Sequence, residues 1–189
     1  MKRLKAFAVG MILAAAGLMF YCGSFYITSH RQNKEAEENW KQIEQTAHTS
    51  EQTSEDHAVK QKKRKEKNKK QKIRESFGIS WENLRKINPR TVAWITVPGA
   101  DISYPVVQGD DDEFYLKHNF QDEENLFGCI FLGKANRKDF SDSHSFLYGH
   151  NMQGNMMFAN LNRYEDPAYL EQCPEFEIIT PEKKYTYRI

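Results

Sequence analysis

One histidine stands where an apolar segment ends, in the stretch SFLYGHN (145–151). A free imidazole has a pKa of about 6.5, so a histidine facing a cleft from a strand end can move protons near neutral pH. Gly149 leaves space beside the ring, and Asn151 begins a loop of small and polar residues. His150 is therefore a candidate catalytic acid or base. The alternative is a structural role, which is more common for a lone histidine. It would still need a nucleophile.

The three cysteines of the chain are poor candidates for that nucleophile. Cys22 lies in an apolar N-terminal segment, and Cys129 lies inside the run CIFL, where a buried thiol behaves as a small hydrophobic group. Cys173 precedes Pro174 in a polar loop without a cationic pattern that would lower its pKa. Their number and spacing exclude a disulfide framework and a CxxC zinc motif, although a single Cys129–Cys173 bridge remains open.

No metal or cofactor site is predicted. His144 and His150 are separated by a strand segment that spans roughly 20 Å, so they cannot share one ion unless the chain folds back between them. The acidic runs at 110–113 and 122–124 lack the alternating ligands and the glycine of an EF-hand loop. We interpret both runs as solvated loops.

The N-terminal segment, residues 1–28, predicts a membrane anchor. Three basic residues precede an uncharged run from Ala6 to Thr28, which as a helix would rise about 35 Å and could cross a hydrocarbon core of roughly 30 Å. Basic residues on the short flank favour a cytoplasmic N-terminus. The alternative is a cleaved signal peptide, but its apolar core is normally shorter, about 7–15 residues. We therefore expect a single-pass protein whose C-terminal part is extracellular.

Residues 29–75 form a polar segment whose first half is acidic and whose second half is basic. Ten basic residues fall between Lys60 and Arg74. Such a composition cannot bury a core, so it predicts a charged stalk that is partly helical or disordered. The basic block is either a solvated spacer or a contact for a polyanion such as anionic lipid or wall polymer. Nucleic acid is not an expected partner of a segment outside the membrane.

Globular patterns begin near Phe77 and predict a mostly β domain over residues 76–189. Short strands with little intervening helix are typical of a barrel or a sandwich. We expect a helix over 81–87, helical turns over 114–117 and 156–162, and strands over 91–97, 102–108, 129–132, 145–148, 176–180 and 184–189. Pro105 inside the second strand favours an edge position or a bulge. The last strand stops in mid-pattern, so we expect the chain to be truncated.

Several of these segments together resemble the class B sortases, which are membrane-anchored cysteine transpeptidases of Gram-positive bacteria. The resemblance runs from about Ser80 to Ile189 and rests on INPRTVAWITVPGADISYPVVQ (87–108), DDEFYLKHNF (111–120), NLFGCIFL (125–132), SFLYGHNMQGNMMFANLNRY (145–164) and EFEIITPEKKYTYRI (175–189). It implies a sortase-type β-barrel, incomplete here, with short helices, a transmembrane helix and a charged stalk before it.

The resemblance also implies an activity. Class B sortases cleave a sorting signal of surface proteins through a cysteine thiolate and join the product to an amine of a peptidoglycan cross-bridge or of a pilin. It assigns the acid/base role to His150 and a place in the substrate groove to Leu116, without any cofactor. Cys129 falls where the family usually has a small residue, which favours packing.

The chain departs from the family at two motifs. The family's nucleophilic cysteine lies in a TLxTC-like strand end and its arginine on the next strand, and neither motif occurs in these 189 residues. We expect both residues beyond residue 189, and we expect this fragment alone to be inactive. The alternatives are a non-catalytic truncated remnant of a sortase and a membrane-tethered wall-binding module.

Overall fold

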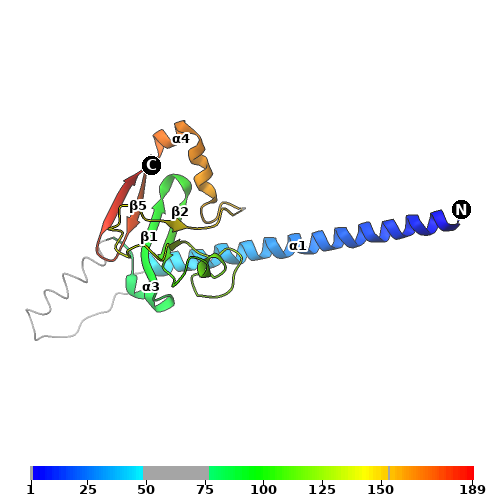
Figure 1. The fold of residues 1–189 in the computed structure, drawn as a ribbon, viewed down its shortest axis with the longest axis horizontal. Coiled ribbons are helices and arrows are strands. Elements are labelled where there is room, and N and C mark those ends of the chain that lie inside the picture. The colour runs from blue at the N-terminus through cyan, green and yellow to red at the C-terminus, as the bar shows by residue number, and fades with distance from the viewer. Residues whose placement is uncertain (1, 49–76, 153) are drawn as a thin grey trace, which may run out of the picture. The chain divides into compact units, whose positions relative to one another are not determined.

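The computed structural model describes residues 2–48, 77–152 and 154–189. For residues 2–22 it describes the backbone and not the side chains. The predicted basic block at 60–74 therefore lies outside the described residues. The chain divides into two compact units, Met1–Asn39 and Trp40–Ile189 (Figure 1).

The first unit is helical. Helix α1 (Lys2–His48) runs without a break for 47 residues, so the predicted stalk is helical at least as far as residue 48. An exposed ion pair joins Arg31 and Glu35 one turn apart. Within the described part of the chain, no helix is both long enough and apolar enough to cross a membrane. The predicted anchor, Ala6–Thr28, falls largely on residues whose side chains lie outside the description.

The last turns of α1 belong to the second unit and enter its core. Ile43 and Ala47 are 2% and 0% exposed, and they cluster with Trp81 and Leu84 of helix α3 (Trp81–Ile87). Trp40 adds an edge-on contact with the ring of Tyr104, at 5.1 Å between centroids. Packing thus begins at residue 40, well before the position near Phe77 where the sequence patterns placed it.

One six-stranded sheet forms the body of the second unit, in the order β4-β3-β2-β1-β5-β6. All neighbouring strands are antiparallel except β2 and β3. The strands are β1 (Thr91–Val97), β2 (Ile102–Val107), β3 (Phe131–Leu132), β4 (Leu147–Tyr148), β5 (Glu175–Ile179) and β6 (Lys184–Arg188). The prediction of a mostly β domain with short helices is confirmed. Among the described strands, β4 and β6 are the edges of the sheet.

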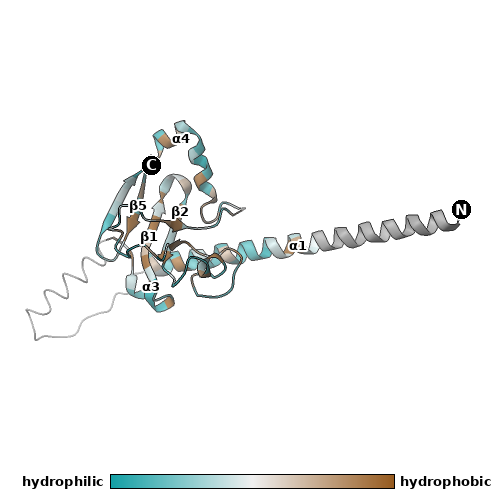
Figure 2. Cartoon of the chain, in the orientation of Figure 1, coloured by the Kyte–Doolittle hydropathy of each residue, from teal (hydrophilic) through white to brown (hydrophobic). Residues whose placement is uncertain are grey.

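Strand β1 is the buried centre of this sheet. Six of its seven residues are buried, which is the pattern of a strand covered on both faces, and Figure 2 shows hydrophobic positions along it. Pro105 predicts an edge position or a bulge, and the edge alternative is wrong, because β2 lies between β1 and β3. Strand β2 pairs with β3 at Val107 alone, so the chain around Pro105 carries no ladder to β3. Pro105 pairs with Trp94 of β1, and the register shift of this pair of strands lies next to it, between Thr91 and Ala93.

Short helical elements connect the strands: η1 (Pro98–Ala100), η2 (Phe114–Leu116), η3 (Ala159–Glu165) and α4 (Pro167–Gln172). Helix α4 was not predicted. Its N-cap is Asp166, whose side chain accepts a hydrogen bond from the backbone N–H of Ala168, and Pro167 occupies the first helical position.

The packing of α1 predicts that its last turns stabilise the domain. Replacing Ile43 by alanine removes a buried side chain from the core and should lower the free energy of unfolding by about 2–5 kcal/mol. Gln42→Ala changes an exposed side chain on the same turn and should cost far less. Urea titration followed by circular dichroism measures both variants. Equal stability of Ile43→Ala and Gln42→Ala would contradict this packing.

Candidate active site around His150

His150 lies just beyond the end of β4, and its half-buried ring points to the backbone of η2. The ring atom Nε2 is 2.7 Å from the carbonyl oxygen of Leu116. A backbone carbonyl can only accept a hydrogen bond, so Nε2 must carry the hydrogen. Within the described part of the chain, Nδ1 has no hydrogen-bond partner. The structure thus brings together the two site residues that we predicted, His150 and Leu116.

Close packing around Gly149 sets the position of this strand end. A Cβ atom at Gly149 would overlap Ile130 and lie 2.8 Å from the ring of Phe158, so only glycine fits here without a shift. The backbone N–H of Phe158 donates to the carbonyl of His150 at 2.9 Å. The chain at Gly149 and His150 is therefore held between Ile130, directly before β3, and Phe158, directly before η3.

A buried polar network supports η2 from the other side. The fully buried Tyr115 donates its hydroxyl to Oδ1 of Asp122 at 2.8 Å. The side-chain amide of Asn88, which is 1% exposed, donates to the carbonyl of Phe120 at 2.9 Å and also reaches Asp122 and the Tyr115 hydroxyl. Burial raises the pKa of Tyr115 to about 12, so the hydroxyl stays a neutral donor. Leu116 follows directly on this anchored side chain.

The acidic run before η2 has a structural role that we did not predict for it. The carboxylate of Asp111 accepts hydrogen bonds from the backbone N–H groups of Phe114 and Glu113, at 2.7 and 2.9 Å. These bonds lower the pKa of Asp111, and the bond from Phe114 has the larger effect. Asp112 accepts from the backbone of Lys134 at 2.6 Å. The run is thus more than a solvated loop, because its carboxylates hold η2 and the next loop in place.

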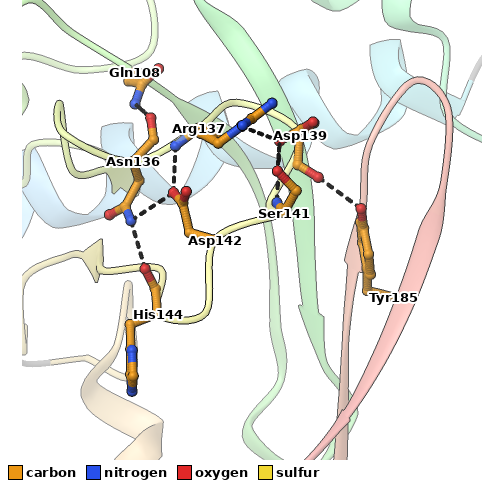
Figure 3. Close-up of polar contacts among 8 residues, drawn as sticks. All are labelled: Gln108, Asn136, Arg137, Asp139, Ser141, Asp142, His144 and Tyr185. Carbon is orange, nitrogen blue, oxygen red and sulfur yellow. Dashed lines mark hydrogen bonds and ion pairs between the residues drawn. The ribbon is translucent and has the colours of Figure 1, made fainter.

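The loop between β3 and β4 is fixed to the end of β2 and to β6 (Figure 3). The side chain of Gln108, at the end of β2, donates to the carbonyl of Asn136 at 2.8 Å, and the hydroxyl of Tyr185 on β6 donates to the carbonyl of Asp139 at 2.7 Å. The Asn136 side chain in turn donates to the carbonyl of His144 at 2.7 Å. These contacts set the point at which the chain enters β4, and so indirectly the place of His150.

Two carboxylates inside this loop accept hydrogen bonds from it. Bonds from the backbone of Arg137 and the side chain of Asn136 lower the pKa of Asp142, and bonds from Ser141 lower the pKa of Asp139. His144 takes part through its backbone, and its ring points away from the network (Figure 3). No group of three His, Cys, Asp or Glu side chains suited to a metal occurs among the described residues.

Both described cysteines are free thiols, so the Cys129–Cys173 bridge that we had left open is not formed. Cys129 is 1% exposed and belongs to the core cluster of Trp94 and Phe131. Burial raises the pKa of its thiol well above the ordinary value, so the thiol is protonated at neutral pH and is a poor nucleophile. Cys173 is half-buried and ends α4.

Comparison with known proteins supports the resemblance found in the sequence. No family model matches the chain. A curated sortase B of Listeria monocytogenes is 38% identical over 94 residues, which are 50% of this chain and 38% of that protein. The chain spans less than half of the curated relatives that it matches, 38% of one and 48% of the other.

Solved structures agree. Sortase B of Clostridium perfringens superposes with a TM-score of 0.56 at 38% identity, over 58% of this chain and 60% of that one. The Staphylococcus aureus sortase B–substrate complex superposes with a TM-score of 0.64 at 26% identity, over 84% of this chain and 64% of that one. The described domain has the sortase fold, and in sequence and structure it is similar to the class B sortases.

Proposed function

We propose that this chain carries the acid/base part of a class B sortase, a cysteine transpeptidase that cleaves a sorting signal and joins the surface protein to an amine. The observation that carries the proposal is the contact of His150 with the carbonyl of Leu116. It holds one ring nitrogen at a strand end in a domain with the sortase fold, and leaves the other for chemistry.

Two solved relatives support the substrate classes. The sortase B of Staphylococcus aureus was solved as a substrate complex, and a sortase B of 27% identity was solved in complex with triglycine. By analogy, we propose that this protein takes a sorting-signal peptide as acyl donor and an amine of the peptidoglycan cross-bridge or of a pilin as acceptor.

In the proposed mechanism, His150 accepts the proton of a cysteine thiol, and the thiolate attacks the scissile carbonyl of the sorting signal. His150 then returns the proton to the departing amine, which leaves a thioacyl enzyme. An incoming amine attacks the thioester and releases the thiol. An arginine would stabilise the oxyanion.

We assign the thiol and the arginine to sequence beyond residue 189. The state of Cys129 supports this assignment, because a protonated thiol packed in the core can neither ionise readily nor reach a peptide. The TLxTC-like motif that contains the family's nucleophilic cysteine is also missing from these 189 residues.

We further propose that residues 6–28 anchor the protein in the cytoplasmic membrane, with the N-terminus inside and the sortase domain outside a Gram-positive cell. The uncharged run and its basic flank support this topology, as does a helix that begins at Lys2. The polar residues after Thr28 would then separate the domain from the membrane and place it near the wall.

The acid/base role predicts a specific loss of activity. In the full-length product of the gene, His150→Ala should lower cleavage of a fluorogenic sorting-signal peptide by about 10²–10⁴-fold, because proton transfer to the leaving amine is lost. Formation of the triglycine adduct, measured by mass spectrometry, should fall in parallel. His144→Ala is the matched control, since its ring is exposed and lies outside the site. Near-normal activity of His150→Ala, or an equal loss in both variants, would remove His150 from the mechanism.

The anchor predicts where the protein is found in the cell. Full-length protein should remain in the membrane fraction after a high-salt wash, whereas a variant without residues 1–28 should be soluble. Replacing the basic residues of 60–74 by glutamine should leave the protein in the membrane fraction, because an apolar span does not depend on charge. Recovery of only a shortened soluble form of the wild type would favour a cleaved signal peptide.

A further inference from the structure

We propose that the backbone carbonyl of Leu116 is the positioning group for His150, and that Nδ1 is consequently the ring nitrogen that exchanges protons during catalysis. The identity of the reacting nitrogen rests on the acid/base role proposed above. The positioning itself does not, and it can be measured on a protein that has no activity.

The first step is the state of the ring. A neutral imidazole carries its hydrogen on either nitrogen, and the partner of one nitrogen decides which form is present. At 2.7 Å from Nε2, the Leu116 carbonyl selects the form with the hydrogen on Nε2 and a lone pair on Nδ1. When Nδ1 takes up a proton, the Nε2 hydrogen bond is kept. The ring therefore needs no rotation between its two charge states.

The second step is the fixed place of the carbonyl. Gly128 packs directly on η2 with a positive φ of 57°. A Cβ atom at this position would overlap the carbonyl of Tyr115 and lie 2.9 Å from that of Leu116. The next residue, Cys129, donates its backbone N–H to the carbonyl of Tyr115 at 3.0 Å. Because Gly128 has no side chain, the Leu116 carbonyl can remain within hydrogen-bond distance of the imidazole of His150.

The third step is the support of η2 by the hydrogen bonds of Tyr115. Tyr115, one residue before Leu116, is tied through its hydroxyl to Asp122 and Asn88, and all three meet within hydrogen-bond distance. Tyr115 and Asn88 are buried whereas Asp122 is exposed, so loss of the hydroxyl removes one hydrogen-bond partner from the buried amide of Asn88 and the tie from η2 to Asp122. Tyr115 is therefore a positioning residue that acts on His150 through the backbone of η2.

Two variants with matched controls test this positioning. Gly128→Ala pushes on the Leu116 carbonyl, and its control Gly78→Ala bears a similar positive φ of 71° with no contact closer than 4.0 Å. Tyr115→Phe removes one buried hydroxyl, and its control Tyr187→Phe removes a half-buried one on β6. If Gly128→Ala does not fold, Tyr115→Phe decides the question.

The measurement is nuclear magnetic resonance of the full chain labelled with 15N-histidine. The chain has six histidines, and the signals that vanish in His150→Gln belong to His150. We expect the neutral wild-type ring to carry hydrogen on Nε2 alone, and this hydrogen to exchange with water at least tenfold more slowly than that of the exposed His144. Gly128→Ala and Tyr115→Phe should speed the exchange several-fold, whereas both controls should not.

Activity of the full-length product gives the second readout. Misplacement of the ring should lower kcat by about 10–100-fold in Gly128→Ala, and in Tyr115→Phe, which does not push on Leu116, kcat should fall with little change in KM. A wild-type ring with hydrogen on Nδ1, or exchange at His150 that neither variant changes, would overturn the positioning proposal. If instead the resonance results hold but His150→Ala is fully active, the proposed function fails and the positioning stands.

Discussion

The hydrogen bond between the ring of His150 and the carbonyl of Leu116 is the contact on which the candidate site depends. It joins two segments 34 residues apart, the end of β4 and the short helix η2. Each segment is held by features that serve this approach. Gly149 and Gly128 remove side chains where backbone and rings come close, and the buried hydroxyl of Tyr115 anchors η2. The site is thus built from main-chain geometry more than from charged neighbours.

The surroundings of His150 and of Cys129 suit these two residues to different roles. The half-buried imidazole of His150 keeps one nitrogen without a partner in the described chain, whereas Cys129 is buried among aromatic rings that keep its thiol protonated. A thiolate needs a partly exposed and electropositive place, which the position of Cys129 does not offer. The described domain therefore holds the imidazole that we propose as the acid/base, and the proposed mechanism brings its sulfur from elsewhere in the full-length protein.

The main strands could be predicted because their burial leaves a pattern in the sequence. Strand β1 reads as a continuous apolar run since both its faces are covered, and the β5–β6 hairpin shows the alternation of a half-buried pair. The contribution of α1 was missed because the surrounding residues are strongly polar. Trp40, Ile43 and Ala47 nevertheless follow the i, i+3, i+7 spacing of a helix face, and this signal could have revealed it.

The site itself could be predicted only as a set of residues. The resemblance assigns roles to His150 and Leu116, but no local pattern says that the backbone of Leu116 meets the ring of His150. Asn88 follows directly on the helix predicted over 81–87, and no pattern around it indicates that its side chain is a centre of the hydrogen-bond network around Tyr115. Similarly, the caps formed by Asp111 arise from the three-dimensional path of the loop. Such contacts depend on tertiary structure, which leaves no periodic trace.

Trapping of the covalent intermediate tests the central claim most directly. The full-length product would be incubated with a sorting-signal peptide without any amine, digested at low pH and analysed by mass spectrometry. Our account predicts a thioacyl adduct on a cysteine other than Cys22, Cys129 and Cys173, and its disappearance when triglycine is added. Absence of any adduct despite turnover, or an adduct on Cys129, would contradict the account.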